Sequence, residues 1–410
     1  CLLPLREVLL MDTFHRDAIQ RLIDYKDTRS IKVITGIRRC GKSMLMEAFY
    51  AYLLKQGIPS EQVVLINFES SQYDDIKDDR DLTRFVQTLH VEGRLYLLFD
   101  EIQRVTHWEK AINGFTVDLN CDLYLTGSNA DLLSSELATY LSGRYVEIHL
   151  LPLSYAEYHA ALAGQRHDTW PSYFRYGGFP GFLEYPQSDR ACRDYLSGIY
   201  HTVVLRDIQT RNNRLDMSLF ELILKFLLDN IGSPISSNRI ADALTASSRK
   251  TYVSTVSEYV DLMCRAFILY RAERFDLQGK RILQSGYKYY VADHGLRNLI
   301  LGFRTFDQGH MLENIVFLEF IRRGYDVKMG QNERSEIDFV VRHEQGIAYY
   351  QVCLSLADPQ VLDREVRALL ALRDNYPKTI LTLDPIGRQD HEGIVIQNIQ
   401  DFLLQQPDQA

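Results

Sequence analysis

The stretch GIRRCGKS at positions 36–43 decides the fold, because it matches the phosphate-loop pattern G-x-x-x-x-G-K-[ST]. It follows IKVIT at 31–35, an apolar run typical of a buried strand, and it leads into SMLMEAFYAYLLK at 43–55, which favours a helix. Strand, glycine turn and helix in this order are the context that the motif requires. The sequence therefore predicts a phosphate-binding loop at the amino end of this helix.

The loop residues have distinct expected roles. Gly36 and Gly41 allow the backbone to curl so that its N–H groups face phosphate oxygens. Lys42 is expected to contact the β and γ phosphates of ATP, and Ser43 to supply a hydroxyl ligand to Mg²⁺. The predicted nucleotide-binding residues are Gly36, Ile37, Arg38, Arg39, Cys40, Gly41, Lys42, Ser43 and Met44. The predicted cofactors are ATP and Mg²⁺.

Short apolar runs alternate with amphipathic helical patterns from about residue 30 to residue 150. Strands with few polar positions between helices are typical of a parallel sheet that helices cover on both faces. The predicted fold class is therefore α/β, a P-loop NTPase parallel sheet in a domain at 12–150.

Polar residues end two further apolar runs of this domain. Asp100 and Glu101 end RLYLLFDE, where Asp100 is predicted to hold Mg²⁺ through water and Glu101 to polarise the attacking water. Alternatively, Asp100 caps the next helix. The run DLYLTGSNA ends in Thr126, Ser128 and Asn129, and we select Asn129 as the sensor of the γ-phosphate, with a role in forming the turn as its alternative.

Arg144, in LSGRY, is the third predicted catalytic residue, beside Glu101 and Asn129. An arginine beyond the sensor strand can stabilise charge on the transferring phosphoryl group, either in cis or from a neighbouring subunit. The second arrangement would make the protein a homo-oligomer. A surface arginine in front of a strand is the simpler interpretation.

Composition limits the other classes of function. At 410 residues, the chain is long enough for two to four domains. Its 46 basic and 54 acidic residues give a net charge of −8, so any contact with DNA has to be local. The six cysteines are scattered singly, which indicates reduced thiols rather than zinc sites: Cys1, Cys40, Cys121, Cys192, Cys264 and Cys353. With no apolar run long enough to span a membrane, the expected location is cytoplasmic, without a membrane partner.

Three segments follow the first domain. A helical connector is expected at 151–215, interrupted by GGFPGF, whose glycines and proline favour a turn. Residues 216–302 have three helical patterns followed by two strands, which is the order of a winged helix. The last segment, 303–410, has the pattern of a small α/β domain.

Together these motifs resemble the bacterial AAA-type ATPases that carry a winged helix and a C-terminal restriction-endonuclease-like domain. The resemblance covers nearly the whole chain and rests on GIRRCGKS, LLFDEIQ, LTGSNA, LSGRY, GGFPGF, KYYVADHGLRN, LENIVFLEFIRRGYDVKMG, EIDFVV and YYQVCLSL. It implies an AAA-type domain at 12–150, ATP binding, Mg²⁺ dependence and weak hydrolysis. It implies no agreed substrate.

The resemblance also implies a nuclease site in the segment 303–410, and the residues there depart from it. Nucleases of that fold place an acid on a first helix, an Asp on a strand and E-x-K on the next strand. Either Glu313 or Glu319 matches the helical acid, and Asp338 matches the strand Asp.

Gln351 and Cys353 stand where the E-x-K pair is expected. Glutamine is a weaker metal ligand than a carboxylate, and cysteine cannot replace the charge of lysine beside a phosphodiester. The sequence therefore predicts a catalytically degenerate module for binding or assembly. An active nuclease that uses another lysine, such as Lys378, is the alternative.

The expected winged helix has a small basic cluster of Arg239, Arg249, Lys250 and Arg281, which makes a phosphate contact with DNA feasible. Its third helix is rich in aromatic and branched residues, and we favour packing on the ATPase domain, as a lid or dimer surface, as its main role.

Two functions therefore stay open. The first is an ATP-hydrolysing switch or motor that acts on DNA or on a protein partner. The second is a module in which the bound nucleotide controls assembly and turnover is negligible.

Overall fold

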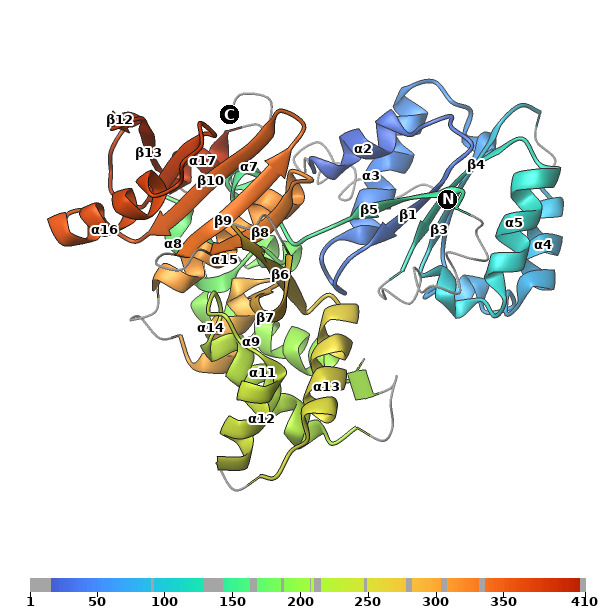
Figure 1. The fold of residues 1–410 in the computed structure, drawn as a ribbon. Coiled ribbons are helices and arrows are strands. Elements are labelled where there is room, and N and C mark those ends of the chain that lie inside the picture. Colours follow the sequence, from blue (N-terminus) through green and yellow to red (C-terminus); the bar gives the residue numbers. More distant parts are fainter. Residues whose placement is uncertain are drawn as a thin grey trace. The chain divides into compact units, whose positions relative to one another are not determined.

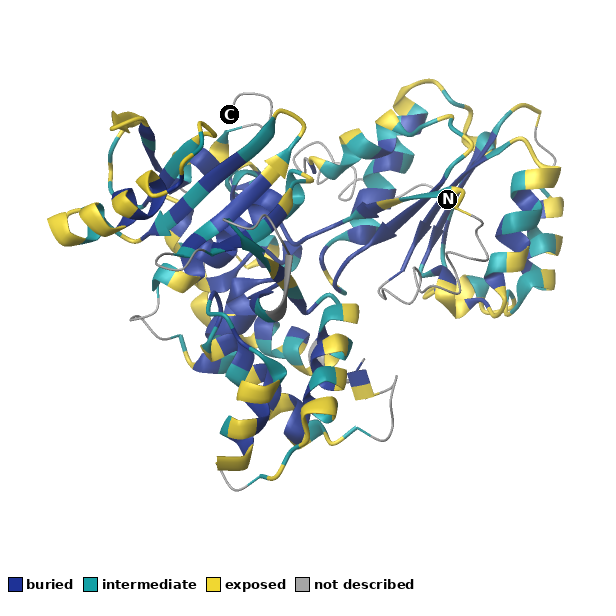
Figure 2. Cartoon of the chain, viewed as in Figure 1, coloured by how far each residue is buried: buried dark blue, intermediate teal, exposed yellow. Residues whose placement is uncertain are grey.

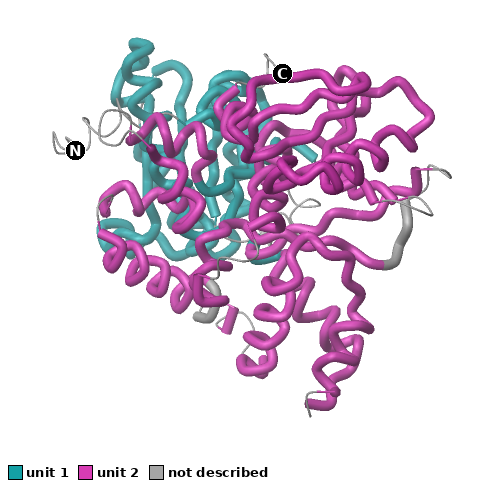
Figure 3. The backbone as a smooth tube through the Cα atoms, turned by 90° about the vertical axis from the view of Figure 1, so that its left-hand side faces the viewer, with its two compact units in different colours: residues 1–152, 265–267 teal, residues 153–264, 268–410 magenta. Residues whose placement is uncertain are grey.

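The protein is seen here in a computed structural model, which describes residues 16–89, 92–127, 143–162, 168–185, 188–206, 208–209, 215–246, 249–277, 282–303, 308–331 and 336–405. The chain divides into two compact units (Figure 3). The first contains 1–152 with 265–267, and the second contains 153–264 with 268–410. None of the helices within these described ranges is long and apolar enough to cross a membrane.

The first unit is built on five parallel strands in the order β2-β3-β4-β1-β5 (Figure 1). The strands are β1 (Ile31–Thr35), β2 (Val63–Asn67), β3 (Leu95–Asp100), β4 (Cys121–Thr126) and β5 (Tyr145–His149). The helices are α2 (Ala18–Asp24), α3 (Lys42–Lys55), α4 (Asp79–Gln87) and α5 (Trp108–Asp118), with short 3₁₀ turns at Ser60–Gln62, Ser71–Tyr73 and Ile102–Arg104. Every residue of β1 and β3 is buried, which is why both strands are apolar runs (Figure 2).

Helices cover both faces of this sheet, and alternate residues of β4 show how. The ring of Tyr124 lies 4.7 Å from that of Phe49 on α3. Leu123 and Leu125 point to the other face, where they join a buried cluster that includes Trp108 of α5. Helices α4 and α5 lie together on that side (Figure 1). The parallel sheet with helices that the sequence predicts is thus confirmed.

The second unit begins with helices and ends in a mixed sheet. Its helices are α7 (Tyr155–Ala161), α8 (Trp170–Tyr176), α9 (Asp189–Ile199), α11 (Met217–Asp229), α12 (Ser237–Ala246), α13 (Val253–Arg265), α14 (His294–Leu301), α15 (Gln308–Arg322), α16 (Pro359–Leu370) and α17 (Ile399–Leu404), with a 3₁₀ turn at Pro180–Glu184 and a π-helix at Tyr200–Arg206. Its strands are β6 (Leu269–Asp276), β7 (Ile282–Val291), β8 (Asp326–Gln331), β9 (Glu336–His343), β10 (Gly346–Cys353), β11 (Lys378–Thr382), β12 (Gln389–His391) and β13 (Ile394–Asn398).

The glycines of the GGFPGF segment pack against the start of α14. The carboxylate of Asp293 accepts hydrogen bonds from the backbone N–H groups of Gly178, at 2.7 Å, and Gly295, at 2.9 Å. Burial raises the pKa of Asp293 to about 7, although these donors act against the rise. A Cβ atom on Gly178 would lie 2.2 Å from the carbonyl oxygen of Leu153, so the segment approaches too closely for any other residue.

The β6–β7 hairpin is part of the C-terminal sheet. The eight strands lie in the order β12-β13-β11-β10-β9-β8-β6-β7, and β6 pairs in parallel with β8 through Arg274–Met329, Phe275–Gly330 and Asp276–Gln331. The three helices α11, α12 and α13 precede the hairpin in the order that the sequence predicts. The sequence did not indicate that the hairpin continues into the sheet of the last segment.

A buried ion pair lies near the amino ends of β1 and β4. Lys32 and Asp122 are both buried, and their ammonium and carboxylate groups are in direct contact. The same carboxylate accepts from the hydroxyl of Tyr124 at 2.9 Å and from the backbone N–H of Asp27 at 2.8 Å. Burial lowers the pKa of Lys32, and Asp122 opposes this by stabilising the charged form.

Replacement of Lys32 by Met is expected to lower the free energy of unfolding of the first unit by about 3–5 kcal/mol, because Asp122 stays buried without its cation. Urea unfolding followed through the fluorescence of Trp108 measures this, with the second tryptophan, Trp170, replaced by Phe. Arg84→Met is the control, since it removes an exposed pair worth at most about 1 kcal/mol. Equal losses in the two variants would contradict the prediction.

Candidate functional site

The GIRRCGKS loop follows the carboxyl end of β1 and has the backbone that its glycines permit. Gly36 and Gly41 have φ values of 144° and 102°, and Arg39 between them has a φ of 70°. A Cβ atom on Gly36 would lie 2.1 Å from the carbonyl oxygen of Leu150. Only glycine fits at position 36, both for its conformation and for its contact with the chain after β5.

Helix α3 starts at Lys42, directly after the loop, so its free N–H groups and the positive end of its dipole face the loop. The buried ammonium of Lys42 donates to the carbonyl oxygens of Gly36 at 3.0 Å and Ile37 at 3.2 Å. Both acceptors are neutral, so these two contacts do not neutralise the positive charge of Lys42. The loop, the helix and the lysine together make a site suited to a phosphate anion.

The other loop residues divide into a buried and an outer group. Ile37 and Cys40 are fully buried, Met44 is half-buried and Arg39 is exposed. Arg38 reaches away from the loop to Glu69, whose Oε1 lies 2.9 Å from Arg38 and 3.0 Å from Arg104. Sequence analysis missed this bridge, because Glu69 belongs to no local motif.

Asp100 ends β3 beside the loop and is 2% exposed. Thr126, at the end of β4, donates its hydroxyl to the Asp100 carboxylate. Burial raises the pKa of Asp100, while hydrogen bonds from Thr126 and Ser43 and the charge of Lys42 lower it. A buried carboxylate beside a serine hydroxyl is the donor set that Mg²⁺ prefers, and these residues therefore fit the metal that the sequence predicts.

Glu101 follows in a left-handed conformation, with φ 56°. Its backbone N–H donates to the Thr126 hydroxyl at 3.0 Å, and its partly exposed carboxylate accepts from the side chain of Gln103. Thr126 thus connects Asp100 to Glu101. The sequence indicated Thr126 only as a polar residue at the end of a strand. Its contact with Asp100 depends on the pairing of β4 with β3, which brings the ends of the two strands together.

Arg144 does not reach the loop of its own chain. It precedes β5, whose Tyr145 pairs with Ile31 at the beginning of β1, whereas the loop follows Thr35 at the other end. Five residues of strand span about 16 Å. Arg144 is exposed at the opposite edge of the sheet, so a role in cis is not supported, and a role toward a neighbouring copy stays a prediction. Asn129 lies outside the described residues.

Comparison with known proteins identifies this part of the chain. A family model described as an AAA domain matches residues 28–159, and a model of a domain of unknown function matches residues 167–307. An uncharacterised protein of Haemophilus influenzae is 39% identical over 395 residues, which cover 94% of this chain and 97% of that protein. The chain belongs to the family of this protein. Its first unit contains an AAA-type P-loop ATPase domain.

Two other proteins are similar over most of the chain. The uncharacterised protein MJ1544 of Methanocaldococcus jannaschii is 28% identical over 373 residues, with 86% of this chain and 80% of that protein covered. The Walker-type ATPase PABY2304 of Pyrococcus abyssi has a TM-score of 0.50 at 17% identity, and covers 71% of this chain and 96% of its own. This structure is similar in fold. The AAA domain therefore makes the chain a nucleotide-binding protein, and the loop, Lys42 and Asp100 form its candidate site.

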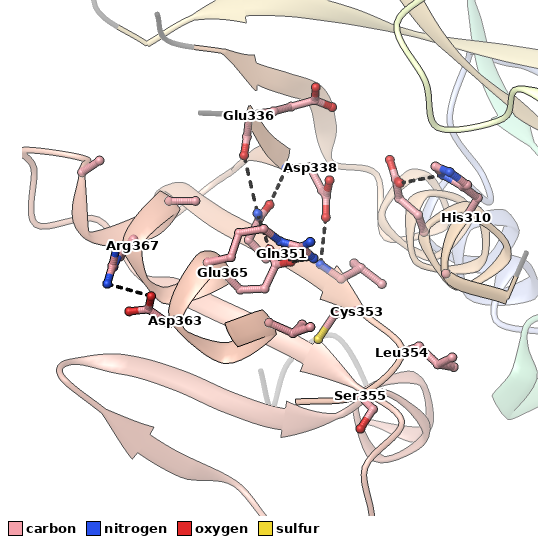
Figure 4. Close-up of a pocket in the computed structure, with 17 residues that line it drawn as sticks. His310, Glu336, Asp338, Gln351, Cys353, Leu354, Ser355, Asp363, Glu365 and Arg367 are labelled. Atoms are coloured by element: carbon pink, nitrogen blue, oxygen red, sulfur yellow. Dashed lines mark hydrogen bonds and ion pairs between the residues drawn. The ribbon is translucent and has the colours of Figure 1, made fainter. Parts of the chain in front are cut away.

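A second group of predicted residues lies far along the chain from the AAA domain, in a cavity of about 1080 Å³ within the second unit (Figure 4). Glu313 of α15 and Asp338 of β9 both line it. Glu319 instead pairs with Arg322 and Arg323 on its own helix. Of the two candidates for the helical acid, the structure therefore brings only Glu313 to Asp338.

Gln351 and Cys353 line the same cavity from β10. The Gln351 side chain accepts from the N–H of Asp338 at 2.7 Å and donates to Glu365 of α16 at 2.8 Å (Figure 4). Lys378 is directed elsewhere, since its ammonium donates to the carbonyl oxygen of Asp374 at 2.7 Å. The lysine suggested from the sequence is therefore not the one nearest to Asp338.

The basic cluster of the helical segment is smaller than the sequence suggested. Arg249 is paired with Asp216 and donates to Ser218 at 2.9 Å. Arg239 and Lys250 are exposed, and Arg281 lies outside the described residues. Two exposed cations on neighbouring elements make a weak surface for a nucleic-acid backbone.

Proposed function

We propose that this chain is a Mg²⁺-dependent ATPase whose nucleotide cycle works as a switch or motor on DNA or on a protein partner, through its second unit. One observation carries the proposal: Lys42 and Ser43, at the start of α3, lie next to the buried carboxylate of Asp100, which the hydroxyl of Thr126 holds. A cation and an anion held together at the amino end of a helix suit the binding of a metal triphosphate.

The residues would divide the work as follows. Lys42 and the N–H groups of the loop would bind the phosphates, while Ser43 and Asp100 would hold Mg²⁺, which would supply positive charge to the phosphate oxygens. Glu101 orients and polarises a water molecule for attack. Thr126 positions both acids, because it donates to one and accepts from the backbone of the other.

Lys42→Ala is expected to lower ATP turnover by about 10²–10³-fold, because it removes the charge that faces the β and γ phosphates. Glu101→Gln is expected to keep ATP binding and to slow hydrolysis by a similar factor, since the amide cannot polarise the water. Equilibrium binding of a labelled nucleotide and single-turnover hydrolysis measure the two effects separately.

Lys55→Ala, at the exposed far end of the same helix, is the matched control and should keep both binding and turnover. Turnover at the wild-type level in both Lys42→Ala and Glu101→Gln would refute the assignment of the site.

Self-association fits the position of Arg144. It lines a hollow of about 780 Å³ in the first unit together with Arg29 and Arg94. Arg94 lies 3.7 Å from Asp27, and Arg29 and Arg144 are exposed. These cations lie too far from the loop of their own chain to contact a nucleotide bound there. They are suited to the phosphates of a nucleotide that a neighbouring copy binds.

We expect the protein to associate when it binds a non-hydrolysable ATP analogue, and Arg144→Ala to abolish this association. Sedimentation velocity with and without the analogue measures it. Arg84→Ala, another exposed arginine away from the hollow, should associate as the wild type does. A protein that stays monomeric with the analogue at high concentration would exclude a role for Arg144 between subunits.

The second candidate function is a module whose bound nucleotide controls assembly, with negligible turnover. The contact between Gln103 and the Glu101 carboxylate favours it, because Gln103 competes with a water molecule for Oε2 of Glu101. The Gln103→Ala variant distinguishes the two candidate functions. If the contact keeps Glu101 from polarising water, its removal should raise the rate of ATP hydrolysis.

We also propose that the segment 216–302 is a winged helix, and that 303–410 is a degenerate restriction-endonuclease-like module for binding or assembly. Gln351 and Cys353 support the second assignment. An amide and a thiol stand in the cavity where a carboxylate and an ammonium group would be needed.

We expect no Mg²⁺- or Mn²⁺-dependent cleavage of plasmid or single-stranded DNA, because an amide and a thiol stand on β10 where the E-x-K pair would be needed. A nicking assay on the full chain tests this, with Asp338→Ala as control. Metal-dependent nicking that disappears in Asp338→Ala would show that the module is an active nuclease.

A further inference from the structure

A lysine from outside the last segment contacts three of the carboxylates that line the 1080 Å³ cavity. Lys288 belongs to β7 of the hairpin, and its side chain is 1% exposed. Its Nζ atom lies 2.9 Å from Oε1 of Glu313, 2.6 Å from Oε1 of Glu336 and 3.5 Å from Oδ1 of Asp338. One ammonium group thus contacts three carboxylates, which come from α15 and β9.

Other protein groups hold the same acids in place. Tyr290, two residues along β7, donates its hydroxyl to Oε1 of Glu313 at 2.7 Å. The second oxygen of Asp338 accepts from the backbone N–H of Val352 at 2.9 Å. Two of the three carboxylates, those of Glu313 and Asp338, are therefore held in place by further hydrogen bonds from this chain.

The charges require a cation at this position. Three carboxylates within reach of one point repel each other, and burial strengthens the repulsion because little water screens it. Burial lowers the pKa of Lys288, but Glu313, Asp338 and Glu336 together raise it more, and the net pKa lies well above its ordinary value. The three carboxylates therefore favour the charged form of the lysine.

Two of the three Nζ–O distances, 2.6 and 2.9 Å, are close to those of charge-assisted N–H···O contacts, about 2.7–2.9 Å, and the third, 3.5 Å, is that of an ion pair. Among the residues that the structure describes, no group of three or more His, Cys, Asp or Glu side chains has the arrangement of a metal site. The acids are spaced to surround a nitrogen atom.

We propose that Lys288 is the built-in cation of this cavity, where its ammonium replaces a divalent metal ion between Glu313, Glu336 and Asp338. The wild-type cavity consequently takes no divalent cation at this point. Removal of the ammonium leaves three carboxylates that only an added cation can neutralise, so a Lys288→Met variant acquires a divalent-cation site. This role is independent of the nucleotide cycle proposed above.

The same contact ties distant strands together. In the sheet order, β7 and β9 are separated by β6 and β8, yet Lys288 of β7 meets Glu336 and Asp338 of β9. The ammonium therefore acts as a direct link between the hairpin and the C-terminal strands, in addition to the backbone pairing of β6 with β8.

Binding of Mn²⁺ to the full chain without nucleotide tests the proposal, with free Mn²⁺ followed by electron paramagnetic resonance and thermal unfolding recorded in parallel. The variants are Lys288→Met, Lys288→Met with Asp338→Asn, and Lys288→Arg. Lys328→Met is the matched control, because Lys328 also faces two carboxylates, Glu273 and Asp326, but these are about half exposed.

Lys288→Met is expected to bind one more Mn²⁺ per chain than the wild type, and the added Asp338→Asn change to abolish this gain. Without Mn²⁺ the Lys288→Met protein should melt several degrees lower, and Mn²⁺ should restore much of that loss. Lys288→Arg, which keeps the charge, and Lys328→Met should bind no more Mn²⁺ than the wild type.

The proposal is overturned if Lys288→Met gains no Mn²⁺, or if Lys328→Met gains as much. Should Lys288→Met not fold, wild type and Asp338→Asn alone decide. A built-in cation requires both to bind the same amount of Mn²⁺, whereas one Mn²⁺ fewer in Asp338→Asn would mean that the wild-type cavity already holds a metal.

Discussion

The parallel alignment of five strands is the constraint on which the nucleotide-binding unit depends. It brings the carboxyl ends of β1, β3 and β4 to one edge, and therefore the loop, Asp100 and Thr126 to one place. The polar residues at this edge are stabilised by each other and by the start of α3. At the opposite edge, Lys32 and Asp122 form a buried ion pair. One end of these strands therefore contributes the candidate nucleotide site, and the other end contributes an ion pair that stabilises the fold.

The sequence predicted the parts of this unit whose signals are local in the chain. A strand, a glycine turn and a helix within 25 residues predict the loop, and an acidic pair after an apolar run indicates Asp100 as a metal ligand. Contacts between distant residues left no such signal. The bridge of Glu69 to Arg38 and Arg104, and the hydroxyl contact of Thr126, depend on which strands are neighbours, and that order emerges only when the sheet is formed.

The second unit shows the same limit more strongly. The order of helices and strands follows from periodicity, and Glu313, one of the two helical acids that the sequence offered, lines the same cavity as Asp338. Lys288 was not expected, because it is 50 residues from Asp338 and lies on an element assigned to a different domain. Lys378, which the sequence offered as an alternative, has its ammonium bonded to the carbonyl oxygen of Asp374 instead.

The β6–β7 hairpin and the last segment form one sheet. Genetic recombination therefore cannot separate the middle segment from the last segment without breaking that sheet. The family model for the middle segment ends at residue 307, just before α15, but β6 finds its parallel partner β8 only beyond that point. A gene fragment cut there would leave β6 without its partner β8 and Lys288 without its three carboxylates, and an unpaired strand edge promotes aggregation. The two segments should therefore be inherited together, as they are in the Haemophilus influenzae relative, which matches 94% of the chain.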